Sequence, residues 1–228
     1  MRIAICIKPV PDLATAYVSK SRGELVEESK RVPTPADLNA VELALSLRHA
    51  GDEVVAFAVA PETTADVLRP ILAVGADRAF LVDDSGAQGG DALADAKALA
   101  AAIRHAGDFD LILCGARSAV HEAGQVGPRV AQALGVPHAG RVTSAAAAEG
   151  GIAVTRAGAL GEGTLELPAL LTVEPGCNRP RLPTAMAAMK AAKKPIERLS
   201  LEQLALPAEE VGELGAAVRL RVMQVPEG

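Results

Sequence analysis

Short apolar runs alternate with longer periodic segments along the first 136 residues of the chain. Four runs are nearly continuous in apolar residues and rich in β-branched side chains, at 2–7, 53–59, 78–82 and 109–114. Such runs are typical of parallel strands that are covered on both faces. Segments with apolar residues at helical spacing follow the first three runs, at 36–51, 62–77 and 90–107. Pro70 should bend the second of these helices. The pattern therefore predicts a doubly wound, mostly parallel α/β sheet with right-handed crossovers.

The rhythm changes after Pro137. Three strands are expected there, two of them forming a hairpin and the third returning, at 140–148, 151–160 and 163–174. From Pro175 onward the chain is rich in proline and basic residues and then only weakly patterned, which predicts an arm that leaves the core. We therefore divide the chain into an α/β domain over residues 1–176 and a C-terminal segment over residues 177–228.

Composition narrows the range of functions. The chain has 228 residues, and half of them are hydrophobic, which suffices for one sizeable core. Its net charge is −5, so it lacks the basic excess of nucleic-acid-binding proteins, and we expect no nucleic-acid partner. It contains one tyrosine, three phenylalanines and no tryptophan. With so few aromatic side chains, this chain alone is not expected to hold a flavin by ring stacking.

Cysteine usage and hydropathy indicate the compartment. Cys6, Cys114 and Cys177 are odd in number and far apart in the sequence, which fits neither a disulfide framework nor a thiolate metal site. Free cysteines indicate a reducing compartment. No segment approaches the roughly 18 consecutive apolar residues of a membrane span. We predict a cytoplasmic protein that is not a membrane protein.

The stretch "CGARSAVHEAGQVGPRVAQALGVP", residues 114–137, follows the fourth predicted strand and opens the next helix. In open α/β sheets the ligand crevice lies beyond the carboxyl ends of the strands. Gly124 and Gly127 bracket the start of this helix, where backbone N–H groups and the helix dipole favour an anion such as a phosphate. The alternative is an ordinary strand-to-helix turn, in which the glycines serve the backbone only.

The same stretch contains Ser118, His121 and Glu122, which raises the question of catalysis. A serine nucleophile normally takes its base from a distant segment, and the chain has no G-x-S-x-G elbow. His121 beside Glu122 is typical of a solvated loop pair. The four histidines are scattered, and no H-x-x-x-H or C-x-x-C pattern is present. We predict neither a catalytic residue nor a metal site in this chain.

Several segments together carry a resemblance to a known family. In chain order they are "IAICIKPVPD", "PADLNAVELAL", "LAVGADRAFLV", "LILCGARSAVHEAGQVGPRVAQALGVP" and "LELPALLTVEPGCNRPRLPTAMAAMKAAKKPI". Their order and spacing over about residues 1–200 resemble the electron-transfer flavoprotein beta subunit, with departures that suggest a divergent paralogue. The resemblance implies a Rossmann-like, adenine-nucleotide-binding domain over residues 1–176, with an added hairpin and a C-terminal arm.

What the resemblance implies about function is a binding and docking subunit, not an enzyme. Proteins of this family pair with an alpha subunit that holds most of an FAD, while the beta subunit usually buries an AMP. The pair accepts electrons from dehydrogenases, such as those acting on acyl-CoA, and passes them to a membrane-linked flavoprotein-quinone oxidoreductase. A second hypothesis stays open, in which the chain is a stand-alone adenine-nucleotide enzyme using His121 and Glu122.

Carrying the family's nucleotide site onto this sequence gives eleven candidate residues, which are Cys6, Thr34, Pro35, Asp37, Val59, Gly115, Ala123, Gly124, Gln125, Val126 and Gly127. Thr34 and Pro35 stand where the family commonly has asparagine and proline, so a hydroxyl replaces an amide. Backbone contacts to a phosphate survive such changes better than side-chain contacts do. The ligand implied by the resemblance is AMP, with a second flavin or an empty site as alternatives.

The segment 177–195 resembles the family's partner-recognition loop, and its candidate docking residues are Ala185, Met186, Met189 and Lys190. Relatives insert a leucine into a pocket of the dehydrogenase, and Ala185 takes that position here. A smaller side chain buries less apolar area. Met186 or Met189 is expected to replace the anchor, because methionine adapts to irregular pockets. The alternative is that these methionines cover the core beneath the arm.

Overall fold

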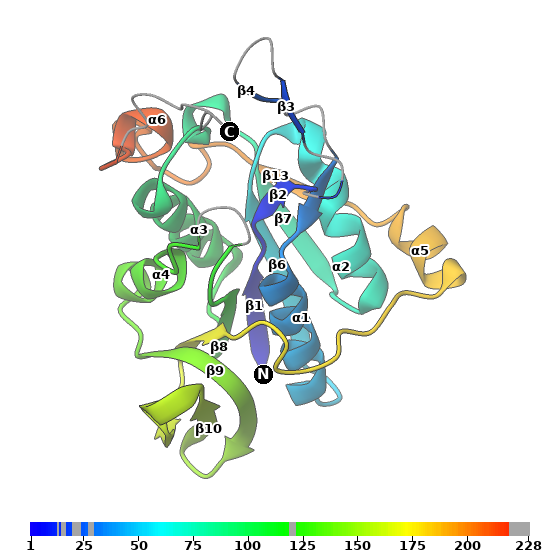
Figure 1. Cartoon of the computed structure of the whole chain (residues 1–228), viewed down its shortest axis with the longest axis vertical. Coiled ribbons are helices and arrows are strands. Elements are labelled where there is room, and N and C mark those ends of the chain that lie inside the picture. The colour runs from blue at the N-terminus through cyan, green and yellow to red at the C-terminus, as the bar shows by residue number, and fades with distance from the viewer. Residues whose placement is uncertain (13, 15–16, 20–23, 27–29, 119–121, 219–228) are drawn as a thin grey trace.

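The computed structural model describes residues 1–12, 14, 17–19, 24–26, 30–118 and 122–218. Within them, nine strands form one sheet with helices on both faces (Figure 1). The strands follow the order β11-β10-β9-β12-β8-β1-β6-β7-β13. This architecture confirms the predicted doubly wound, mostly parallel α/β fold.

The centre of the sheet is parallel. Its strands are β1 (Arg2–Cys6), β6 (Glu53–Val59), β7 (Arg78–Val82), β8 (Leu111–Gly115) and β12 (Ala169–Val173). Almost every residue in these strands is buried, because helices cover both faces. Strand order reverses beside β1, since β6 lies on one side of it and β8 on the other.

Helices on the two faces enclose two hydrophobic clusters. One face carries α1 (Pro35–Leu47) and α2 (Leu68–Val74), and the other carries α3 (Ala92–Ala106) and α4 (Val126–Leu134). Figure 1 shows the two pairs of helices on opposite sides of the central strands. The face with α3 and α4 positions the site described below.

The helix expected over 62–77 is divided. A 3₁₀ helix, η1 (Glu62–Val67), precedes α2, which ends at Gly75 with φ 138°. The division places Pro70 in the first turn of α2, where a missing N–H and a fixed φ are tolerated. Pro70 therefore lies near the start of a helix and does not bend one.

The predicted hairpin is β9 (His138–Ala148) with β10 (Gly151–Arg156), and these strands pair antiparallel. The segment expected as a single return strand is two strands. β11 (Glu162–Leu165) pairs antiparallel with β10, whereas β12 lies between β8 and β9 and is parallel to both. Pro168 separates them, because it has no N–H for a ladder.

The C-terminal arm is present, but it does not leave the core as expected. Asn178 exchanges hydrogen bonds with Asn39 of α1, and the Arg181 guanidinium donates to Glu42 at 2.8 and 2.9 Å. The short helix α5 (Ala185–Ala191) then packs against α2, and β13 (Glu197–Leu199) pairs with β7 at the sheet edge. The division at residue 176 stays a prediction.

Short elements complete the described part of the chain. Two antiparallel ribbons join β2 (Pro9–Pro11) to β5 (Arg31–Pro33) and β3 (Tyr17–Ser19) to β4 (Glu24–Val26). The remaining short elements are three 3₁₀ helices and one α-helix, at separate places along the chain. They are η2 (Ser85–Ala87), η3 (Gly158–Leu160), η4 (Ala208–Glu210) and α6 (Gly212–Gly215). α6 packs against η2 and α3, so residues 208–218 lie beside the start of α3.

Candidate functional site

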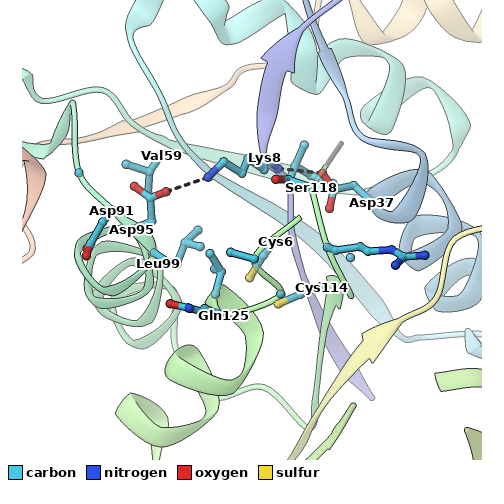
Figure 2. Close-up of a pocket in the computed structure, with 18 of the residues that line it drawn as sticks. Cys6, Lys8, Asp37, Val59, Asp91, Asp95, Leu99, Cys114, Ser118 and Gln125 are labelled. Atoms are coloured by element: carbon cyan, nitrogen blue, oxygen red, sulfur yellow. Dashed lines mark hydrogen bonds and ion pairs between the residues drawn. The ribbon is translucent and has the colours of Figure 1, made fainter. Parts of the chain in front are cut away.

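A cavity of about 780 Å³ lies at the carboxyl ends of β1, β6 and β8 and is bordered by α3 and the start of α4 (Figure 2). The order of strands reverses here, and ligands of open α/β sheets bind at this position. The volume falls within the range of about 300–1,000 Å³ that is usual for small-molecule sites. The cavity is therefore the candidate binding site of this chain.

Eight of the eleven candidate cofactor-binding residues line this cavity, namely Cys6, Asp37, Val59, Gly115, Ala123, Gly124, Gln125 and Val126. The other three, Thr34, Pro35 and Gly127, are not among its lining residues. Thr34 and Pro35 stand at the start of α1, and Gly127 lies in the first turn of α4. Whether any of the eleven contacts a ligand stays a prediction.

Thr34 and Asp37 form a capping box at the start of α1. The Thr34 hydroxyl accepts from the Asp37 N–H at 3.1 Å, and the Asp37 carboxylate accepts from the Thr34 N–H at 3.3 Å. Pro35 occupies the first helical position, which suits its fixed φ. The Thr34 hydroxyl is thus already engaged within the protein, and its side chain is fully buried.

Asp37 also joins α1 to the two strands beneath the cavity. It accepts from the Lys8 N–H at 3.0 Å and from the Gly115 N–H. A Cβ on Gly115 would lie 2.6 Å from Asp37 Oδ1, so only glycine allows this approach. Burial raises the pKa of Asp37 to about 6, although the N–H donors oppose the rise.

The start of α4 forms the opposite wall. Gly124 has φ 61°, and no side chain caps the helix at Gln125. The first N–H groups of a helix have no partner within it and favour an anion. A Cβ on Gly127 would lie 2.2 Å from Thr172 Cγ2 of β12, so this glycine lets the helix pack closely against the sheet. The N–H groups of Gln125, Val126 and Gly127 stand at this helix start.

α3 brings acidic groups to the cavity that the sequence did not reveal. Lys8 Nζ lies 3.3 Å from Asp95 Oδ2, and Figure 2 shows this ion pair between β1 and α3 beside Val59. Asp91 caps α3 by accepting from the N–H groups of Leu93 and Ala94.

The second oxygen of Asp91 accepts from the N–H groups of Ala217 and Val218, both at 3.0 Å. Burial would raise the pKa of Asp91, but the four backbone donors Ala94, Val218, Leu93 and Ala217 together outweigh it and lower the pKa. Val218 also lines the cavity. The carboxylate therefore joins the start of α3 to the C-terminal segment at the cavity wall.

Some of the cavity residues that the sequence analysis missed carry a sequence signal that could have identified them, and others carry none. Asp91 directly precedes a periodic segment and follows two glycines, which is a recognisable N-cap signal. Lys8 directly follows the first strand. Asp95 and Val218 have no such mark, because their position depends on how α3 and the C-terminal segment pack.

Of the candidate catalytic pair, only Glu122 belongs to the described residues. Glu122 is exposed, has φ 48° and does not line the cavity. His121 lies outside the described residues. Among the residues that the structure describes, no group of three or more His, Cys, Asp or Glu side chains is arranged to hold a metal ion.

The candidate docking residues lie together on α5, on the side of the molecule that carries α2 (Figure 1). Met186 is 67% exposed and Met189 is 72% exposed, and Ala185 and Lys190 are exposed as well. The alternative in which the methionines cover the core is therefore wrong. Their role in docking stays a prediction.

Fold and site together define a Rossmann-like α/β protein with a binding cavity at the switch point of its sheet. The family model for the electron transfer flavoprotein domain matches residues 23–204. The chain therefore belongs to the electron transfer flavoprotein family, as its motifs predicted. As a member of this family it is an electron carrier and not an enzyme.

Individual relatives agree with this assignment. The chain is 33% identical to the electron transfer flavoprotein subunit beta of Megasphaera elsdenii, over 99% of this chain and 88% of that protein. It is 32% identical to the caffeyl-CoA reductase-Etf complex subunit CarD of Acetobacterium woodii, over 93% and 83%. It is 34% identical to protein FixA of Azorhizobium caulinodans, over 85% and 73%. In the part of the chain that the structure describes, no helix is long and apolar enough to cross a membrane.

Proposed function

We propose that this chain is the cytoplasmic beta subunit of a heterodimeric electron transfer flavoprotein. An alpha subunit holds most of the FAD, and an AMP occupies the cavity of this chain. The pair takes electrons from dehydrogenases that act on acyl-CoA and delivers them to a membrane-linked flavoprotein-quinone oxidoreductase. The name of the A. woodii relative, which associates it with a caffeyl-CoA reductase, supports the choice of CoA esters.

The observation that carries the AMP assignment is the uncapped start of α4 at the wall of the cavity. The N–H groups of Gln125, Val126 and Gly127 would hold the phosphate. Apolar lining from Val59 and Leu99 suits the faces of a purine. Neither Arg117 nor Arg129 needs to take part, because Arg117 pairs with Glu174 and Arg129 with Gln125.

The described aromatic residues support an FAD that is held mainly by the partner. Phe57 stacks on Phe80 at 5.3 Å and meets Phe109 edge-on at 5.6 Å, all three within the core. None of these three rings lines the cavity. FAD, when bound, supplies the two-electron store, and this chain contributes a wall to its environment.

The proposal assigns separate tasks to the two predicted segments. Residues 1–176 bind the nucleotide, and residues 177–228 meet partner proteins. The exposed methionines of α5 support the second task, because α5 packs against α2 while both side chains stay exposed.

The test compares the full-length chain purified alone with the chain co-expressed with an alpha subunit from the same genome. We expect a flavin absorbance band only from the pair, and AMP released from denatured protein in both preparations, identified by mass spectrometry. A flavin band near unit occupancy from the chain alone would overturn the placement of FAD. A different released nucleotide, or none, would overturn the AMP assignment.

A further inference from the structure

Two cysteines meet at the floor of the cavity. Cys6 ends β1, Cys114 lies near the end of β8, and the two residues are register partners in neighbouring parallel strands. Both thiols are free, both side chains are buried, and both line the cavity. Figure 2 shows them on the same side of the sheet, next to Gln125. Neither the fold nor the proposed function requires a pair of thiols here.

The spacing of the two residues allows a disulfide. Neighbouring strands lie about 4.7–4.9 Å apart, and this separation falls within the range of about 4.4–6.8 Å between the Cα atoms of bridged cysteines. The register places the two side chains on one face, so no rotation of a strand is needed.

The environment gives the two sulfur atoms different roles. The Cys6 thiol beside it and then burial raise the pKa of Cys114 well above its ordinary value. A thiolate, not a thiol, attacks an oxidant. Cys6 is 5% exposed and Cys114 is 3% exposed, so we take the more accessible Cys6 as the attacking group and its register partner Cys114 as the resolving group. The third cysteine, Cys177, belongs to the arm over α1 and serves as an internal control.

We propose that Cys6 and Cys114 form a redox-active dithiol that a small hydroperoxide, such as hydrogen peroxide, converts into an intramolecular disulfide. Cys6 Sγ attacks one peroxide oxygen, the O–O bond breaks, and water leaves, which yields a sulfenic acid. Cys114 Sγ then attacks Cys6 Sγ, the S–O bond breaks, and a second water leaves with the Cys114 proton. The two sulfur atoms lose two electrons in total, and the peroxide gains two.

The position of the pair links this chemistry to the ligand site. Any molecule that fills the cavity covers both sulfur atoms, so occupancy protects the dithiol from the oxidant. A disulfide at the same place fixes the ends of β1 and β8 to each other beneath the ligand. This link, unlike the dithiol itself, rests on the proposed nucleotide site.

The test treats the full-length chain with hydrogen peroxide and maps its peptides without reduction. We expect a Cys6–Cys114 cross-linked peptide that is lighter by two hydrogens, and free thiols that fall from three to one per chain. The reaction should be faster at higher pH, because more thiolate forms. A Cys177→Ala variant should give the same cross-link.

Cys114→Ala separates the two roles. It should give no cross-link and should leave Cys6 as a sulfenic acid that dimedone traps. The proposal is overturned if native protein forms no cross-link between Cys6 and Cys114, or if dimedone labels Cys177 alone. Protection by added AMP, measured as slower cross-linking, should accompany the main result. A cross-link that AMP fails to slow would keep the dithiol and overturn the nucleotide site.

Discussion

Asp37 shows at the scale of a single residue how the site is held together. Asp37 is 4% exposed, and its carboxylate accepts hydrogen bonds from the N–H groups of Lys8, Thr34 and Gly115, so it joins α1 to β8 and to the residues just after β1. Burial of a carboxylate is unfavourable unless hydrogen bonds compensate it. These bonds compensate only in part, because the pKa remains raised to about 6.

Asp37 should make stability depend on pH in a defined window. Between pH 4 and 6 the folded protein holds a proton on Asp37 that the unfolded chain has lost, so the free energy of unfolding falls as pH rises through this window. Asp37→Asn removes this titration. The stability of the wild type relative to Asp37→Asn should therefore increase by about 1–3 kcal/mol from pH 6 to pH 4. Urea denaturation at four pH values measures the difference, and a constant difference would contradict the assignment.

Gly124 and Gly135 offer a matched test of the α4 site. Both have positive φ, at 61° and 75°, and they flank the two ends of the same helix. A Cβ on Gly124 would lie 3.1 Å from the Ala116 carbonyl oxygen at the cavity, whereas a Cβ on Gly135 meets nothing within 4 Å. Valine at either position should cost about 1–2 kcal/mol of stability. Only Gly124→Val should abolish AMP binding in calorimetry, and equal affinity in both variants would remove Gly124 from the site.

The sequence predicted those cavity residues that lie next to a recognisable local signal, such as a strand end or a glycine before a helix. Gly115 and Cys6 end strands, and Gly124 shortly precedes a helix. Thr34 was expected near the ligand through family resemblance, but its hydroxyl caps α1. Asp95 could not be placed, because its pairing with Lys8 depends on how α3 packs against the sheet.

At the scale of elements, the hydrophobic pattern predicted the strands that are buried in the core. The four buried runs became β1, β6, β7 and β8, because each is covered on both faces. Short elements escaped prediction. β13 has three residues and no pattern of its own, and its place is set by pairing with β7. The division between η1 and α2 depends on Pro70, whose effect varies with its distance from the helix start.

α5 should act as a docking element without supporting the fold. Met186→Ala and Met189→Ala should each reduce electron transfer from the cognate dehydrogenase, because truncating a buried interface anchor typically costs more than about 1 kcal/mol of binding. Thermal stability should change little, since both side chains are exposed in this chain. Lys193→Ala, on the same arm, is the control and should keep full transfer rates. Loss of stability equal to the loss of transfer would mean that α5 has only a structural role.

At the scale of the whole molecule, hydrogen bonds between segments far apart in the sequence hold the C-terminal segment against the α/β core. The Leu201 N–H donates to Asp84, more than 100 positions earlier, and Glu213 donates from its N–H to the Gln88 carbonyl. A Cβ on Gly212 would lie 2.0 Å from the Gly86 carbonyl oxygen, so only glycine passes there. No local pattern encodes such contacts, which explains why the sequence predicted a departing arm.

Asp91 should hold the C-terminal segment at the cavity, and a serine substitution can isolate this role. Serine caps a helix about as well as aspartate, so Asp91→Ser should keep α3 intact. A single hydroxyl, however, cannot also accept from the N–H groups of Ala217 and Val218, which now share the second carboxylate oxygen. We therefore expect faster hydrogen exchange over residues 208–218 and unchanged exchange over α3.

Asp91→Ala should release the segment and also lose about 1 kcal/mol of stability with the helix cap. Since Val218 lines the cavity, AMP should dissociate faster from both variants. Exchange over residues 208–218 that matches the wild type in Asp91→Ser would show that η4 and α6 hold the segment without the carboxylate.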